Sequence, residues 1–353
     1  MRPFVYEQLA GRVVFGEGTV AEIPNEIDLL AASRVLLVSD TMAKDDGDAL
    51  QAALGDRVVA RIAETRPHVP AEDAEDTRRL AEEHEVDGVV TIGGGSTTGL
   101  GKALVLDREV AFLAVPTTYA GSEMTPIYGI TGGAVKRTGR HPRVKPRTVV
   151  YDVELTVDIP LDVTAGSVMN ALAHCVEALY AKERNPIISV LALEGITALR
   201  RGAVAVSNVR RDRVGRSDLL YGAFLAGTAL GATGVAVHHR ICHVLGGTFG
   251  LAHGDANAVI LPYAVAYNRD SEPEVMRAVA GVLDATDAAG GLYELARNLG
   301  APGSLSTLGI DETQLDRAAD MVTEAGGYNP RPVERGWVRS LLQEAFEGGP
   351  PSR

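Results

Sequence analysis

Cysteine is scarce in this sequence, and long hydrophobic runs are absent. The two cysteines among 353 residues, Cys175 and Cys242, cannot build a disulfide framework, so we expect a reducing compartment. No stretch reaches the roughly 18 uninterrupted apolar residues of a membrane helix. The first residues break into polar residues and glycine before a signal-peptide core develops. These absences predict a cytoplasmic protein that does not enter a membrane.

Positive charge is also in short supply. With 34 Lys and Arg against 46 Asp and Glu, the formal net charge is −12 at pH 7. Such a chain repels phosphate backbones and anionic lipids, which argues against nucleic acid and membrane surfaces as partners. A small molecule is the expected ligand.

What is present is a globular composition arranged in two halves. Hydrophobic residues make up 46%, and a chain of 353 residues favours two domains. In the first half, short β-branched runs alternate with helical stretches, which predicts an α/β domain with a parallel sheet. After residue 158 the strand signal stops, and Ala/Leu-rich segments predict an all-α domain. We therefore expect domains at 1–158 and 159–353.

The expected elements follow from this change of period. The expected strands are Arg34 to Ser39, Val58 to Ile62, Gly88 to Ile92, Ala111 to Val115 and Thr148 to Tyr151. The expected helices include Ala71 to Glu83, Asp162 to Ala181, Ile187 to Ser207, Ser217 to Gly231 and Glu274 to Asp287.

A glycine turn joins a predicted strand to a predicted helix. The run Gly93 to Gly99 reads GGGSTTG, and a helix is expected from there to Leu106. Glycines let a phosphate approach the backbone, and the N–H groups of a helix N-terminus attract it. The run is not the G-x-G-x-x-G fingerprint, so it indicates either a diphosphate site or only a tight turn.

Polar groups follow two other predicted strands. Thr117 and Thr118 come after the strand that ends at Val115, at the edge where open α/β sheets bind ligands. Asp40 closes the strand that ends at Ser39. Its carboxylate could accept hydrogen bonds from an adenosine ribose, and it could equally cap the helix that follows. The residues alone leave both roles open.

Histidines gather in the second half. Asn170 and His174 are four residues apart, as are His239 and His243, so each pair lies on one face of a helix. Three imidazoles in a cleft could bind a divalent metal, but an open catalytic site normally adds a carboxylate or a further nitrogen. The alternative is metal-free acid–base and hydrogen-bond chemistry. The five histidines concerned are His174, His238, His239, His243 and His253.

A basic segment precedes the strand at Thr148. It could steer an anionic substrate or a cofactor phosphate, or it could form the solvated rim of a hairpin. We single out Lys136 within it. The segment contains Lys136, Arg137, Arg140, His141, Arg143, Lys145 and Arg147.

Four segments are together similar to one family. They are GGGSTTGLGKA from Gly93, VPTTYAGSEMTPI from Val115, MNALAHCVEALYA from Met169 and HHRICHVLGGTFGLAH from His238. They resemble maleylacetate reductases, a branch of the iron-containing alcohol dehydrogenase-like superfamily, and the resemblance covers nearly the whole chain. It implies a Rossmann-like dinucleotide-binding α/β domain and an all-α catalytic domain. This is the dehydroquinate synthase-like fold, with the active site in the cleft between the domains.

The resemblance also assigns a cofactor, NADH or NADPH, and the residues that bind it. Asp40 matches the position that favours NAD over NADP. The residues implied at the diphosphate are Gly94, Gly95, Ser96 and Thr97, and those on the path toward nicotinamide are Thr117, Thr118 and Ser122. Lys136 completes the expected cofactor-binding set.

The same resemblance bears on metal. In metal-dependent relatives the ligands are one aspartate and three histidines. His174, His239 and His253 match the histidines, whereas Asn170 stands where the aspartate would be. Maleylacetate reductases resemble this chain in having asparagine there, so no tightly bound metal is expected. The stretch from Gly254 to Asn257 looks more like the metal-dependent alcohol dehydrogenases, which leaves the substrate open.

The implied reaction is the reduction of 2-maleylacetate to 3-oxoadipate in aromatic-compound degradation. His174, His239 and His253 would hold the developing enolate, and His243 matches a position beside the nicotinamide that suits a proton relay. Lys136 and Arg140 would meet the small anionic carbonyl substrate. The alternatives are another carbonyl or alcohol oxidoreductase, a dehydroquinate synthase-like lyase and a regulator without turnover. The resemblance also implies a homodimer.

Overall fold

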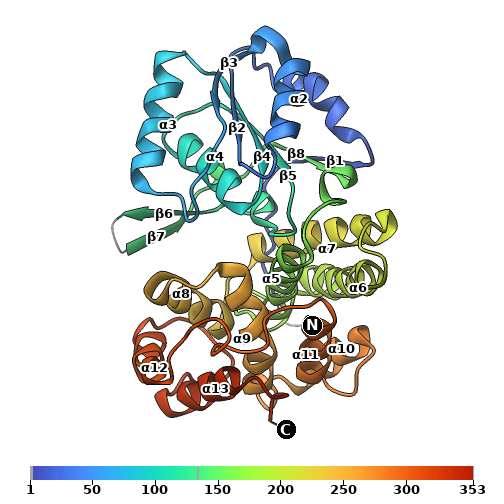
Figure 1. Ribbon diagram of the computed structural model, residues 1–353, viewed down its shortest axis with the longest axis vertical. Helices are drawn as coiled ribbons and strands as arrows, with labels where there is room; N and C mark the ends of the chain where they lie inside the picture. The colour runs from blue at the N-terminus through green and yellow to red at the C-terminus, as the bar shows by residue number, and fades with distance from the viewer. Residues whose placement is uncertain (1–2, 133–134, 353) are drawn as a thin grey trace. The chain divides into compact units, whose positions relative to one another are not determined.

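The computed structural model describes residues 3–132 and 135–352 (Figure 1). For Val135 and Lys136 it describes the backbone only. The chain forms two compact units. The first is Glu7–Asp158, and the second contains the chain from Ile159 onward together with Pro3–Tyr6. No single helix in the described ranges is long and apolar enough to span a membrane. The helices Arg213–Ala232 (α7) and Val237–Phe249 (α8) meet that criterion only as a pair bent by 99°.

The α/β unit contains a parallel sheet in the order β1-β8-β5-β4-β2-β3. Its strands are β-branched runs that lie buried because helices cover both faces. The sequence analysis did not predict strand β1 of this sheet. It is an edge strand whose residues are largely exposed, so it lacks the continuous apolar run that identified the other strands. The strands are β1 Arg12–Gly16, β2 Val35–Ser39, β3 Val58–Ile62, β4 Gly88–Gly93, β5 Ala111–Pro116 and β8 Thr148–Asp152.

Alternate residues of β2 divide the core of this unit into two layers. Leu36 and Val38 pack with residues of α3 and α4, whereas Val35 and Leu37 pack with residues of α1 and α2. The carboxyl ends of the parallel strands therefore lie at one edge, next to the start of α4. The helices are α1 Ile23–Leu29, α2 Lys44–Leu54, α3 Ala71–Glu83 and α4 Gly95–Asp107.

The basic segment contributes to an antiparallel hairpin. Strand β6, Ile127–Gly132, pairs with β7, Val135–Arg140, and a short 3₁₀ turn at Pro142–Val144 follows. The side chain of Lys136 lies outside the described part of the structure, so its proposed role stays a prediction.

The second unit is helical. Helix α5 carries His174 and packs against α6, α7 and α9. The predicted helix Glu274 to Asp287 is wrong at its end: α10 ends at Leu283, because Asp284 turns into the left-handed region with φ 54°. The helices are α5 Leu161–Tyr180, α6 Pro186–Asn208, α7 Arg213–Ala232, α8 Val237–Phe249, α9 His253–Asn268, α10 Pro273–Leu283, α11 Ala288–Asn298, α12 Leu315–Glu324 and α13 Arg335–Glu347.

Candidate functional site

At the edge of the sheet, one carboxylate joins two segments of the predicted cofactor site. Asp40 Oδ2 accepts hydrogen bonds from the Gly94 N–H at 3.0 Å and from Thr97 Oγ1 at 3.0 Å. Asp40 Oδ1 accepts from the Ala43 N–H at 2.9 Å, just before α2. The structure therefore brings Asp40 together with two of the predicted diphosphate residues, and it also gives Asp40 a local backbone-capping contact.

Gly93 makes this arrangement possible. Its φ of +153° is rarely adopted by other residues, and a Cβ there would lie 2.3 Å from Asp40 Oδ2 and 2.6 Å from Thr97 Oγ1. The carbonyl of Gly93 accepts a hydrogen bond from the Thr117 N–H at 3.0 Å, which ties the end of β5 to the end of β4. The glycine turn is thus shaped by the groups that surround it.

The remaining predicted cofactor residues lie along the same edge. Gly94 is the N-cap of α4, and Gly95 and Ser96 begin the helix, whose first N–H groups have no partner within it. A Cβ on Gly94 would lie 3.4 Å from Thr118 Cγ2. Ser122 opens a short 3₁₀ turn, Ser122–Met124, after β5. These positions suit an anion at the α4 N-terminus.

A buried lysine fixes that 3₁₀ turn, and the sequence analysis did not single it out. Lys102 Nζ, on α4, donates to Ser122 O at 2.6 Å, Ile127 O at 2.7 Å, Thr125 O at 2.9 Å and Thr125 Oγ1 at 3.0 Å. Because Thr125 Oγ1 itself donates to Ser122 O, all four oxygens accept from Nζ, which favours the ammonium form. Burial lowers the pKa of Lys102 to about 7, and the neighbouring Glu123 carboxylate opposes that shift.

In the helical unit, α5 presents a polar stripe. Asn170, His174 and Glu177 are separated by four and three residues, so they share one face of the helix. All three are at least 93% buried, in a helix whose other buried residues are mostly apolar. The predicted pairing of Asn170 with His174 on one face is confirmed.

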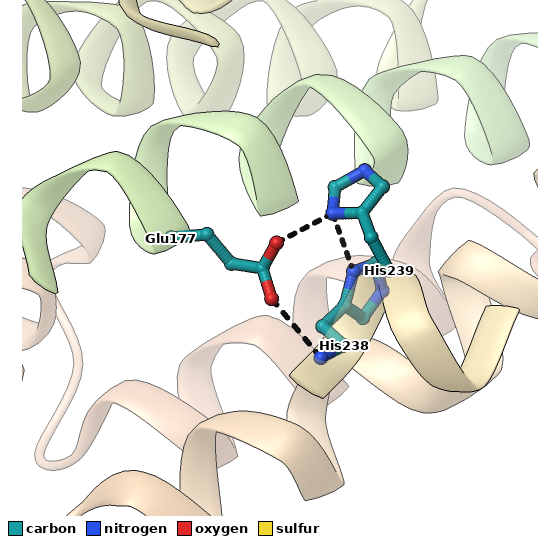
Figure 2. Close-up of side chains that lie close together, drawn as sticks. All are labelled: Glu177, His238 and His239. Carbon is teal, nitrogen blue, oxygen red and sulfur yellow. Dashed lines mark hydrogen bonds and ion pairs between the residues drawn. The ribbon is translucent and has the colours of Figure 1, made fainter. Parts of the chain in front are cut away.

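Helix α8 supplies the groups that face this stripe (Figure 2). Glu177 Oε2 lies 2.6 Å from His239 Nδ1, and Glu177 Oε1 accepts from the backbone N–H of His238 at 3.0 Å. The other edge of the His239 ring faces α5 again, with Nε2 3.3 Å from Asn170 Oδ1. His239 is therefore held on two edges by side chains of one neighbouring helix.

The four predicted catalytic histidines form a continuous row. The ring of His239 stacks on that of His174 with centroids 4.5 Å apart, and its centroid is 6.3 Å from that of His243. The ring of His243 stacks on that of His253 at 6.0 Å. His174 and His239 are buried, His253 is partly buried and His243 is exposed. The row thus runs from the protein interior to its surface.

A close backbone contact places the last member of the row. His253 is the first residue of α9. A Cβ on Gly166 of α5 would lie 2.8 Å from Gly254 Cα, so only glycine lets the two helices approach this closely. The contact sets the start of α9, and hence His253, against α5.

Burial sets the charge of these groups. It lowers the pKa of His238 to about 3 and that of His239 far below its usual value, with His243 and His253 adding to the second shift. Burial raises the pKa of Glu177, while His238 and the backbone N–H groups at the start of α8 oppose that rise. His238 and His239 are therefore neutral near pH 7, and each ring has one N–H donor and one acceptor nitrogen.

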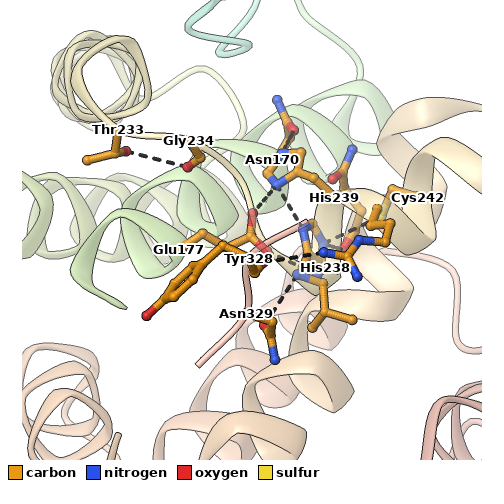
Figure 3. A network of polar contacts seen from close by, with 12 residues as sticks. Asn170, Glu177, Thr233, Gly234, His238, His239, Cys242, Tyr328 and Asn329 are labelled. Carbon is orange, nitrogen blue, oxygen red and sulfur yellow. Dashed lines mark hydrogen bonds and ion pairs between the residues drawn. The ribbon is translucent and has the colours of Figure 1, made fainter. Parts of the chain in front are cut away.

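Further contacts hold the start of α8 (Figure 3). Asn329 Oδ1 accepts from the Val237 N–H at 3.4 Å, and Asn329 Nδ2 donates to Asn268 Oδ1 at 2.7 Å. His238 Nε2 lies 3.4 Å from Asn257 O and 3.6 Å from Cys242 Sγ. His238 thus has one ring nitrogen toward the protein core and the other, Nδ1, 3.3 Å from His239 Nδ1.

Comparison with known proteins agrees with both units. The model described as "Iron-containing alcohol dehydrogenase" matches residues 10–153, and the model "Fe-containing alcohol dehydrogenase family, C-terminal" matches residues 164–346. The chain belongs to the iron-containing alcohol dehydrogenase family. Its fold, a parallel-sheet α/β unit followed by a helical unit, is the fold of this family, as the sequence predicted.

Within the iron-containing alcohol dehydrogenase family, similar relatives carry one name. A maleylacetate reductase of Burkholderia cepacia is 44% identical over 352 residues, which is 100% of both chains. One of Rhizobium sp. (strain MTP-10005) is 43% identical, covering 99% of this chain and 100% of its own. The crystal structure of maleylacetate reductase from Agrobacterium tumefaciens has a TM-score of 0.95 and 42% identity over 99% of this chain and 100% of that one.

The family name implies iron, and the histidine geometry tests the fit. An imidazole binds an ion in its own ring plane, about 2.1 Å from the nitrogen. The rings of His174 and His239 are stacked, with planes only 9° apart, so their planes do not meet at a common point near the nitrogens. Asn170 supplies no charge in place of a carboxylate. The matched residues do not present the geometry that an iron ion requires.

A second group of possible ligands lies beside them. One ligand atom from each of Glu177, His238 and His239 lies within 4.8 Å of the others. Two ligands of one tetrahedral ion lie about 3.4 Å apart, given bonds of about 2.1 Å. Glu177 Oε2 and His239 Nδ1 are 2.6 Å apart, which is the distance of a hydrogen bond. Glu177 was not among the predicted site residues. Its signal was an acidic residue on the same face as Asn170 and His174 in an otherwise apolar helix.

Proposed function

We propose that this chain reduces 2-maleylacetate to 3-oxoadipate with NADH or NADPH. The observation that carries the proposal is the row of four imidazoles beside Asn170, because such a row can hold an oxyanion with N–H donors and without a cation. The names of the full-length relatives support the choice of substrate.

When bound, the reduced nicotinamide supplies a hydride to the enone carbon that is β to the ketone. The carbon–carbon double bond then breaks, its electron pair moves toward the ketone, and an enolate forms. A proton added to the neighbouring carbon completes 3-oxoadipate. The protein's task is to hold the charge on the enolate oxygen and to deliver that proton.

The buried histidines suit the first task. Preorganised N–H donors aimed at a developing oxyanion are commonly worth about 3 kcal/mol each. We assign the enolate to His174, His239 and His253 as a group. Low-dielectric surroundings strengthen each hydrogen bond, and the first two of these residues are buried.

His243 suits the second task. It is exposed on α8, and its ring lies between those of His239 and His253. An exposed imidazole can give a proton to the substrate and take another from water. The cofactor would be held at the sheet edge by the α4 N-terminus, Asp40 and the threonines after β5. We also propose, from the resemblance alone, a homodimer in the cytoplasm that serves aromatic-compound degradation.

The test is a turnover assay with enzymically generated maleylacetate, NADH and NADPH. We expect kcat/KM with maleylacetate to exceed that with neutral aldehydes and ketones by at least about 100-fold, since the latter form no extended enolate and carry no carboxylates. The residues from Gly254 to Asn257, which look like those of metal-dependent alcohol dehydrogenases, favour the rival activity on simple carbonyls. A higher kcat/KM with a simple carbonyl would replace the proposed substrate.

A further inference from the structure

We propose that Glu177 is a positioning residue that acts through His239. A single buried carboxylate bonds both the ring of His239 and the backbone at the start of α8, and so fixes the direction in which the ring presents its other nitrogen. The inference deepens the proposed function and rests on it for its kinetic test.

The first step is that the two carboxylate oxygens of Glu177 bond different partners. Oε2 bonds the ring nitrogen Nδ1 of His239 at 2.6 Å, and Oε1 accepts from the His238 N–H at 3.0 Å. Glu177 is 1% exposed, so protein groups rather than water must satisfy it. The carboxylate thus couples the orientation of a side chain to the position of the helix that carries it.

The second step concerns the first turn of α8. The N-cap of this helix, Ala236, has no side chain able to accept a hydrogen bond from the first turn. Glu177, which comes from α5, takes that role by accepting from the His238 N–H (Figure 2). A negative charge at a helix N-terminus is also favoured by the helix dipole. Removing the carboxylate therefore loosens the turn that begins the histidine segment.

The third step is the effect on the Nε2 edge of the His239 ring. With Nδ1 held by Glu177, the ring of His239 can only direct Nε2 toward Asn170 and keep its face stacked on His174. Rotation about the side chain would break the Glu177 contact and the stacking together. Glu177 touches neither substrate nor cofactor in this account, so its effect on the reaction passes through the orientation of His239.

The experiment compares two substitutions of Glu177 with a matched control on α8. Glu177→Ala removes both contacts, whereas Glu177→Gln keeps the shape, with a carbonyl oxygen that can accept from the His238 N–H and an amide group that can donate to His239 Nδ1. Cys242→Ala truncates another fully buried side chain of α8, whose Sγ lies 3.6 Å from His238 Nε2 and which bonds neither Glu177 nor Asn170 among the described contacts. Thermal midpoints show whether each variant is folded and by how much it is weakened.

We expect Glu177→Ala to lower kcat by roughly 100-fold, the cost of a small misplacement of a reacting group. The Kd for NADH should not change, because the predicted cofactor residues lie in the other unit. Glu177→Gln should recover a large part of the lost kcat, and Cys242→Ala should keep the kcat of the unsubstituted enzyme despite a lower thermal midpoint. Equal kcat values for Glu177→Ala and Cys242→Ala, or no recovery in Glu177→Gln, would overturn the inference.

A spectroscopic measurement separates this inference from the proposed function. In protein labelled with ¹⁵N-histidine, the short contact between Glu177 Oε2 and His239 Nδ1 should give a strongly downfield proton resonance that Glu177→Ala abolishes and Cys242→Ala retains. Failure of maleylacetate turnover in the unsubstituted enzyme would count against the proposed function only. Absence of the downfield proton, or its persistence in Glu177→Ala, would count against the role of Glu177.

Discussion

Each unit of the molecule buries a charged side chain almost completely, but the two are surrounded in different ways. In the α/β unit, Lys102 is 1% exposed and its three N–H groups meet four oxygens of the segment that follows β5. In the helical unit, Glu177 is equally buried and bonds His239, whose opposite edge faces Asn170. Lys102 is enclosed by acceptors, whereas Glu177 bonds a ring that belongs to a row of histidines reaching the surface.

The difference separates a structural cluster from a chemical one. All three N–H groups of the Lys102 ammonium donate to protein oxygens. Lys102 can therefore hold the Ser122–Met124 turn but has no N–H left for a ligand. The histidine row instead runs from buried His174 to exposed His243. Burial keeps His239 in this row neutral, and the row reaches the surface at His243. Access to the surface, more than burial, distinguishes the two clusters.

The largest expected effect comes from opening the enclosed cluster. Lys102→Met removes the ammonium that the carbonyls of Ser122, Thr125 and Ile127 share, and breaking a buried charged network in this way costs about 3–5 kcal/mol. We expect a loss of that size in the free energy of unfolding, measured with urea. The matched control is Lys44→Met, since Lys44 is exposed and pairs with Asp48 across one turn of α2. It should cost less than about 1 kcal/mol. Equal costs for the two variants would mean that Lys102 does not hold the turn.

A smaller effect should follow from separating α5 and α9. Gly166→Ala places a methyl group 2.8 Å from Gly254 Cα, and overpacking of this kind costs about 1–3 kcal/mol. Because the displaced backbone carries His253, kcat should fall as well. Gly281→Ala is the control, since a Cβ on that helical glycine meets nothing within 4 Å. It should be neutral or stabilise the chain by about 0.5–1 kcal/mol. An unchanged kcat in Gly166→Ala would show that the contact does not place His253.

Periodicity predicted most of the fold. Helix α3 has the predicted bounds, and β3 was also predicted to the residue, because both show a clear period of one element type. Strand β1 was missed because an exposed edge strand of five residues carries little apolar signal. The end of α10 was misplaced because the left-handed turn at Asp284 is a backbone choice that apolar spacing does not encode.

The candidate site could be predicted only in part. Spacing placed Asn170 with His174 and His239 with His243, each pair on one face of a helix. It could not supply the contact between Glu177 and His239, which joins residues 62 positions apart. Nor could it show that Asp40 bonds Gly94 and Thr97, since that depends on the register of neighbouring strands.

The most direct test of the account asks whether the histidine row works without a cation. Maleylacetate turnover is measured before and after exhaustive treatment with a strong chelator, and the iron and zinc content of the same preparations is determined by mass spectrometry. We predict that kcat is unchanged when the metal content has fallen far below one ion per chain. Loss of activity on chelation, with recovery on adding one equivalent of a divalent ion, would contradict the account.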